Sequence, residues 1–156
     1  MSDDPYGRPT FGPALFYKDP RAMLAWLAQA FGFRIDMVIT EDDGAVSHAE
    51  MRFGDGYFML GGEWADWAKS PASVGGTNTQ GLHVHLTEDV DTHCERARTA
   101  GARIVMEPAD QFYGDRVYRA LDPEGHSWTF SQSVRAVSRE TAERESGLKI
   151  EGWPDI

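Results

Sequence analysis

The sequence predicts an α+β fold made of two tandem βαβββ modules, and the main observation behind this prediction is an internal repeat. The segment 32–37 (GFRIDM) resembles the segment 101–106 (GARIVM) at an offset of 69 residues. The same offset aligns Asp55-Gly56 with Glu124-Gly125. Because one shift without gaps relates separated places, the chain reads as two copies of one supersecondary unit.

The first copy shows the element order strand, helix and three strands. A short apolar strand is predicted over 11–17, and a helix begins at Pro20, since proline is favoured at the first helical position. Apolar residues then recur three and four positions apart, as in an amphipathic helix. Gly32 follows the helix, where a left-handed conformation is needed. Three strands complete the copy, over 33–40, 46–53 and 57–60.

The second copy repeats this order. A strand is predicted over 82–87 and a helix over about 89–100, which Gly101 ends. Strands over 103–107, 116–121 and 127–131 follow. The last turn, Asp122-Pro123-Glu124-Gly125, combines a proline that presets φ with a glycine that is free to take positive φ.

The repeat divides the chain into parts of one domain spanning 1–156. Module one covers about 10–62, a linker about 63–80, module two about 81–132 and a C-terminal tail 133–156. A length of 156 residues suits one domain with one substantial core. In the tail, Ser138 is expected to cap a short helix that runs to Glu145.

Charge and composition narrow the partners of the protein. The formal net charge is −10 and 41% of the residues are hydrophobic, which is typical of a globular chain. Nucleic acids and anionic membranes select basic surfaces, so we expect neither as a partner. No segment approaches the roughly 18 apolar residues that a membrane span requires, and Cys94 is the one cysteine. We therefore expect a cytoplasmic protein with a small-molecule ligand.

A family resemblance rests on the last hairpin together with the repeat. The segments 113–116 (YGDR), 122–126 (DPEGH) and 128–130 (WTF) resemble the vicinal oxygen chelate superfamily, which includes glyoxalase I, extradiol dioxygenases and bleomycin-resistance proteins. Within it, the chain is most similar to PhnB-like glyoxalase-related proteins, over about residues 10–132. The resemblance implies a cupped mixed sheet with helices on its outer face. It also implies a homodimer in which half-cups complete each other.

The resemblance also places the usual metal site. Metal enzymes of the superfamily carry His, Gln or Glu on the first and the last strand of each module. Here those positions fall near Gly12 or Pro13, Leu60, Leu82 and Thr129. None of them offers the imidazole, thiolate or carboxylate donors that a transition metal needs. We therefore predict that the chain holds neither a metal nor another cofactor. A shift of one residue would put His83 in place of Leu82.

Two groups of residues in module one are candidates for ligand binding. Trp64 and Trp67 follow its last strand and can clamp a cationic or planar ligand, or they can be buried in a helical turn. His48 and Glu50 share one face of the third strand. They can act as an acid–base or metal-binding pair, or they can belong to a solvated or dimer-facing side.

Three further groups lie in module two. His83, with His85 on the same strand face, can line a cavity or be a structural sheet histidine. Tyr113, Arg116 and Tyr118 surround the penultimate strand, where Arg116 can bind a carboxylate or form an internal ion pair. Thr129 lies on the small, polar face of the last strand, opposite Trp128 and Phe130.

The residues leave three functions open. The first is metal-free binding of a small cationic or aromatic molecule by a glyoxalase/bleomycin-resistance-like protein. The second is a metal-dependent lyase, isomerase or dioxygenase with displaced ligands drawn from His48, Glu50, His83 and His85. The third is an interaction module whose cup is filled by its own side chains. We rank them in this order, and whether the protein is an enzyme stays open at this level.

Overall fold

The strands form two mixed sheets of four, one from each module, in the computed structural model, which describes residues 3–154. Module one contains β1 (Ala14–Tyr17), α1 (Pro20–Phe31), β2 (Arg34–Thr40), β3 (Val46–Phe53) and β4 (Gly56–Gly62). Its strand order is β1-β4-β3-β2, and β1 runs parallel to β4. We call this sheet one.

Module two repeats the arrangement with β5 (Gly81–His85), α2 (Val90–Thr99), β6 (Arg103–Asp110), β7 (Asp115–Leu121) and β8 (Ser127–Ser133). The order of this sheet two is β5-β8-β7-β6, with β5 parallel to β8. A short 3₁₀ helix, η1 (Pro71–Ser73), lies between the modules, and α3 (Arg139–Ser146) follows them. The predicted pair of βαβββ modules is confirmed. Each module forms a four-stranded sheet of its own.

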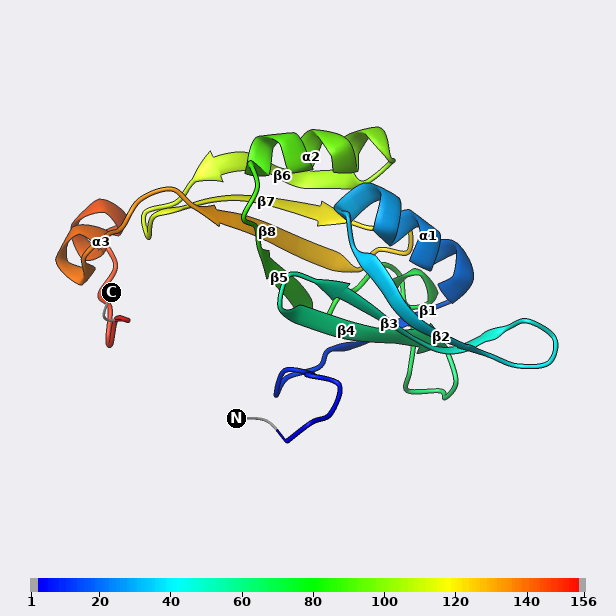
Figure 1. Cartoon of the computed structure of the whole chain (residues 1–156). Coiled ribbons are helices and arrows are strands. Elements are labelled where there is room, and N and C mark those ends of the chain that lie inside the picture. Colours follow the sequence, from blue (N-terminus) through cyan, green and yellow to red (C-terminus); the bar gives the residue numbers. More distant parts are fainter. Residues whose placement is uncertain (1–2, 155–156) are drawn as a thin grey trace.

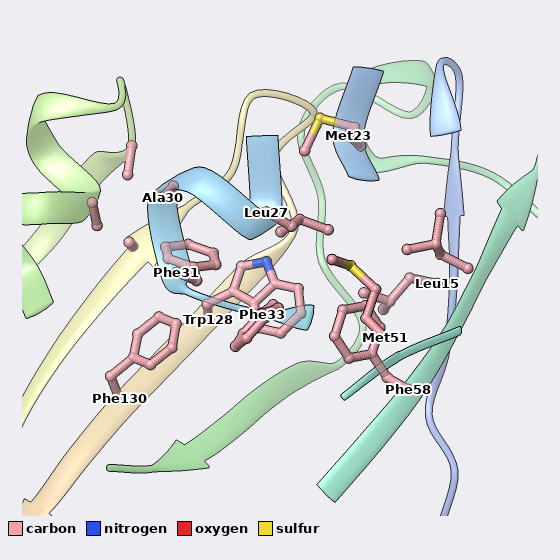
Figure 2. Packing of buried hydrophobic residues seen from close by; sticks show 14 of the residues in the cluster. Leu15, Met23, Leu27, Ala30, Phe31, Phe33, Met51, Phe58, Trp128 and Phe130 are labelled. Carbon is pink, nitrogen blue, oxygen red and sulfur yellow. The ribbon is translucent and has the colours of Figure 1, made fainter. Parts of the chain in front are cut away.

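Each sheet has two faces of different character. α1 packs on sheet one and α2 on sheet two, and we call the covered sides the helix faces and the opposite sides the open faces (Figure 1). The two helices touch, since the Trp26 Nε1–H donates to the Ala100 carbonyl at 2.7 Å. One hydrophobic cluster runs across both helix faces, with Phe31 and Phe33 of module one packed against Trp128 of module two (Figure 2).

Local capping signals set the helix boundaries, and among them Ser138 and Gly32 were predicted from the sequence. The Asp19 carboxylate accepts a hydrogen bond from the Ala22 N–H at the start of α1, and Asp89 and Ser138 cap α2 and α3 in the same way. Gly32 ends α1 with a φ of 77°, in the left-handed region that favours glycine. The capped helices fix where each module turns back to its sheet.

The last turn of module two joins the modules through a buried carboxylate. Asp122 accepts hydrogen bonds from the Tyr17 hydroxyl at 2.6 Å and from the Trp128 Nε1–H at 3.1 Å. Its other oxygen accepts from the Glu124 and His126 backbone N–H groups. The Asp-Pro-Glu-Gly turn is therefore a tertiary anchor as well as a hairpin.

A buried histidine forms the second polar link between the modules. His93 of α2 is 1% exposed and lies between the Tyr118 hydroxyl, at 2.6 Å, and the Phe31 carbonyl, at 2.9 Å. Nε2–H donates to the carbonyl, so Nδ1 accepts from Tyr118. Burial lowers the pKa of His93, because its surroundings disfavour the imidazolium.

The two turns before the last strands differ in length, and this shifts the repeat by one residue. Ala49 and Tyr118 hold the same place in β3 and β7, at the offset of 69, but Leu60 matches Phe130 at an offset of 70. The reason is the longer turn of module two, because five residues lie between the paired Leu121 and Ser127, while four lie between their counterparts Arg52 and Tyr57.

Two segments extend from the sheets. The N-terminal segment lies on the open side of sheet one, where the Arg52 guanidinium donates to the Tyr6 carbonyl at 3.1 Å, and α3 projects from the far end of sheet two (Figure 1). In the part of the chain that the structure describes, no helix is long and apolar enough to cross a membrane.

Candidate ligand-binding site

The tryptophan pair is exposed beside sheet one. Trp64 and Trp67 are 68% and 71% exposed, and their rings pack edge to face with centroids 4.7 Å apart. Trp67 also meets the Phe16 ring edge to face at 6.3 Å. Phe16 lies on the open face, because its neighbours Leu15 and Tyr17 are buried in the core. Burial of both indoles in a helical turn is therefore ruled out.

The acidic residue before these tryptophans has a structural role. The Glu63 carboxylate accepts hydrogen bonds from the Ser70 N–H and the Ser73 hydroxyl, and the Ser70 N–H bond chiefly lowers the pKa of Glu63. It holds the loop that leads into η1. The aromatic pair is thus presented on a fixed loop, and its own surface stays open to a ligand.

His48 and Glu50 lie together on the open face of sheet one. His48 Nε2 is 3.3 Å from Glu50 Oε1. The alternation predicted for β3 is confirmed, since Ala49 and Met51 are fully buried on the helix face. Glu50 itself is only 8% exposed, although it points away from the core. Alternation in the sequence predicted the face on which Glu50 lies, but it did not predict that this carboxylate is buried there.

The expected metal positions do not supply a metal-binding set. Leu60 lies in the core and is 1% exposed, and Leu82 packs against this core. Both side chains therefore lie on the helix faces. This corrects the placement of the ligand positions at these two residues, because the one-residue shift puts Met59 where Leu60 was expected and His83 replaces Leu82. Among residues 3–154, no three His, Cys, Asp or Glu side chains group so that they could hold a metal ion.

Polar side chains form one row across the open face of sheet two. His83 of β5 pairs with Thr129 of β8, Thr129 pairs with Arg119 of β7, and Arg119 pairs with Met106 of β6. Residues paired across strands share a face. Strands lie about 4.8 Å apart, so the imidazole, hydroxyl and guanidinium of the row begin within about 10 Å of one another.

The next row contains a buried hydroxyl between two imidazoles. Ser131 Oγ lies 2.8 Å from His83 Nε2 and 2.9 Å from His85 Nδ1, and Ser131 is fully buried. One hydroxyl can donate to one imidazole and accept from the other, so both rings bond while neutral. Burial and, after it, the charge of His85 lower the pKa of His83, which favours the neutral ring.

Arg116 and Tyr118 lie on the helix face and do not join this surface. Arg116 donates to both oxygens of Asp91 in α2, at 3.0 and 3.1 Å, and to Asp110 at 3.0 Å. Tyr118 is fully buried against His93. The internal ion pair, left open by the sequence, is the arrangement found for Arg116. Tyr113 is 37% exposed beside β7, and burial followed by the charge of Asp115 raises the pKa of its hydroxyl.

A cleft of about 510 Å³ opens along the free edge of β5, toward the start of β4. Two of the histidines singled out in the sequence, His83 and His85, lie in its wall. A group of aromatic residues in the lining was not predicted from the sequence: Phe11, Phe33, Phe53, Tyr57, Phe58 and Trp128. Arg119 was not predicted as a site residue either. Strict alternation along β7 from the buried Tyr118 would have placed Arg119 on the open face.

Comparison with known proteins agrees with this architecture. The model of the Glyoxalase/Bleomycin resistance protein/Dioxygenase superfamily matches residues 11–130. An uncharacterised protein of Mycobacterium tuberculosis is 33% identical over 135 residues, which cover 83% of this chain and 78% of that protein. An uncharacterised protein of Mycobacterium bovis is equally identical, over 83% of this chain and 87% of its own length.

Solved structures give the same result. TioX from Micromonospora sp. ML1 is 32% identical and superposes with a TM-score of 0.64, over 80% of this chain and 99% of TioX. A glyoxalase/bleomycin resistance protein/dioxygenase family enzyme from Burkholderia phytofirmans is 22% identical, with a TM-score of 0.59 over 78% of this chain and 95% of its own. At that identity, the likeness is one of fold.

Proposed function

Because the chain belongs to the glyoxalase/bleomycin resistance protein/dioxygenase superfamily, we propose that it binds a small planar organic molecule without a metal ion. The exposed tryptophan pair beside Phe16 is the observation that carries the proposal. Large aromatic side chains seldom gather on a surface without a contact to make. Indole faces bind planar rings by stacking and cations by cation–π attraction.

The proposal includes a homodimer that completes the binding cup. All residues of β2 are exposed, among them Ile35, Met37, Val38 and Ile39 at 36–49%. An apolar edge strand of this kind is a site for association. Strands β1 and β5 are also open on one edge, because each pairs only with the last strand of its own module. A second copy can cover these edges and bring another open face over the ligand.

Two finer assignments belong to the same proposal. We place the protein in the cytoplasm, where reducing conditions keep the buried Cys94 a thiol. We also group it with the PhnB-like branch, as the hairpin of module two indicates. Neither assignment changes the proposed binding surface, which consists of the Trp64, Trp67 and Phe16 rings.

Metal content of untagged protein purified without chelator is the first test. Plasma mass spectrometry should find far less than one transition metal per chain. A panel of cationic, neutral and anionic bicyclic aromatics should then include compounds that raise the unfolding temperature and quench tryptophan fluorescence. A panel without such compounds would contradict the proposal.

The metal-dependent lyase, isomerase or dioxygenase is the second candidate, and the neighbouring His83 and His85 favour it. Their ring centroids are 4.9 Å apart. About one bound transition metal per chain, lost on mutation of His83 to Ala, would establish this candidate and exclude the first. Light scattering of the same sample tests the dimer, since a monomer would leave the cup without its second side.

A further inference from the structure

The open face of sheet two carries an arginine side chain, Arg119, that has no partner within the described chain. Arg119 is exposed, and its guanidinium makes no hydrogen bond or ion pair with residues 3–154. By contrast, Arg116 on the opposite side of the same strand is held by two carboxylates. A guanidinium is always charged and presents a planar fork of donors. The fold thus leaves this fork available to something outside the chain.

The neighbours of Arg119 favour an anion. In its row, Thr129 provides a hydroxyl, which can donate, and His83 provides an imidazole next to it. Val117, the next open-face residue along β7, is apolar and 1% exposed. Asp115, two residues before Val117, is the acidic residue of β7 on the open face. It forms no ion pair with Arg119 among the described residues. The row therefore concentrates donors around one unpaired positive charge.

The place of Arg119 also accounts for the misfit with a metal site. His83 and Thr129 lie on the first and last strands of module two, where the metal enzymes of the superfamily carry ligands. A divalent ion held at His83 would lie about two strand spacings from the guanidinium, and two cations at that distance repel. The Arg119 guanidinium supplies at this place the positive charge that a metal ion supplies in the metal enzymes.

We infer that the row His83, Thr129 and Arg119 binds a carboxylate, or a similar planar oxyanion, on an aromatic ligand. This inference rests on the proposed function and specifies its ligand as an aromatic acid. The Arg119 fork pairs with both carboxylate oxygens, in the bidentate geometry that makes such pairs strong. Thr129 donates to one of these oxygens. The aromatic part of the ligand extends past His83 toward the ring-lined cleft beside β5, whose wall also contains Phe11 and Pro13, just before the strand β1 that carries Phe16.

Two isosteric probes test the inference on the full chain. 2-Naphthoate carries the carboxylate, and 2-naphthamide is its neutral counterpart. Titrations followed by NMR should show that naphthoate binds about tenfold more tightly and shifts the arginine Nε–H signal of Arg119. The variant Arg119→Met should lose this preference while it still binds the amide, and Arg119→Lys should keep part of it.

Arg103→Met is the matched control. Arg103 is exposed and lies one row away on β6, opposite Leu121, and its guanidinium makes no hydrogen bond or ion pair among the described residues. Its removal takes away the same charge from the same sheet and should leave the preference within about twofold. An equal loss in both variants would overturn the inference, because the preference would then report net charge.

The remaining outcomes separate the inference from the proposed function. Equal affinities of the wild type for both probes would overturn the inference alone. Binding of neither probe at about 10 mM would count against both. Titration with Zn²⁺ alone gives an independent reading: stoichiometric binding that is lost in His83→Ala would replace the anion site with a metal site.

Discussion

The open faces of the two sheets differ, although the modules repeat the same fold. Sheet one presents aromatic rings, with Trp64, Trp67 and Phe16 at its edge. Sheet two presents a donor-rich row that ends in the unpaired Arg119. The helix faces, in contrast, merge into one hydrophobic core (Figure 2). The covered sides of the two sheets thus serve the same packing, while the open sides carry different chemistry.

The largest effect we expect comes from the contrast between tryptophans on the two kinds of surface. Trp128→Ala removes a fully buried ring that packs on Phe31, Phe33 and Phe58, and should cost about 3–5 kcal/mol of unfolding free energy. Trp64→Ala should change stability by less than about 0.5 kcal/mol, because the ring is exposed. Urea denaturation of both variants measures the difference. Similar losses would mean that the open face is part of the core.

The second prediction concerns the anchor that holds the two helix faces together. Asp122→Ala leaves the Tyr17 hydroxyl and the Trp128 N–H without a buried acceptor, and should cost about 2–4 kcal/mol. Asp122→Asn keeps one carbonyl oxygen and should cost less. Denaturation midpoints rank the variants. An alanine variant as stable as the asparagine variant would show that these hydrogen bonds contribute little.

The third prediction uses pH. The folded pKa of His93 lies below its unfolded value, so the stability due to the neutral ring is full above about pH 6.5 and is lost as the pH falls toward the folded pKa. The slope from one such group is at most about 1.4 kcal/mol per pH unit. His93→Gln should flatten this loss between about pH 7 and 5. An unchanged slope would assign the loss to other groups, such as His83, whose pKa shifts in the same direction.

The smallest effect concerns the aromatic surface itself. Trp67→Ala removes the ring that contacts both Trp64 and Phe16, and should weaken binding of a bicyclic aromatic about tenfold with little change in stability. Trp153→Ala, in the tail, is a control for loss of an indole elsewhere. Affinity unchanged by Trp67→Ala would place the ligand away from sheet one.

Some parts of the site were readable from the sequence, because they depend on local rules. Alternation placed His48 and Glu50 opposite Ala49 and Met51, and it placed Thr129 opposite Trp128. The single offset of the repeat did not reveal the longer second turn. It therefore put a ligand position on Leu60, which the structure buries. A one-residue change of register moves every side chain of a strand to the other face.

The sequence by itself determined the two βαβββ modules, their helix caps and their turns, since periodicity, capping and glycine positions act over a few residues. Only the tertiary structure decided which charged side chains form internal ion pairs. Arg116 and Arg119 lie three residues apart, and the sequence gives no sign that Asp91 and Asp110 neutralise one and leave the other free. That choice depends on how α2 and β6 pack beside β7, and such long-range contacts have no local signature.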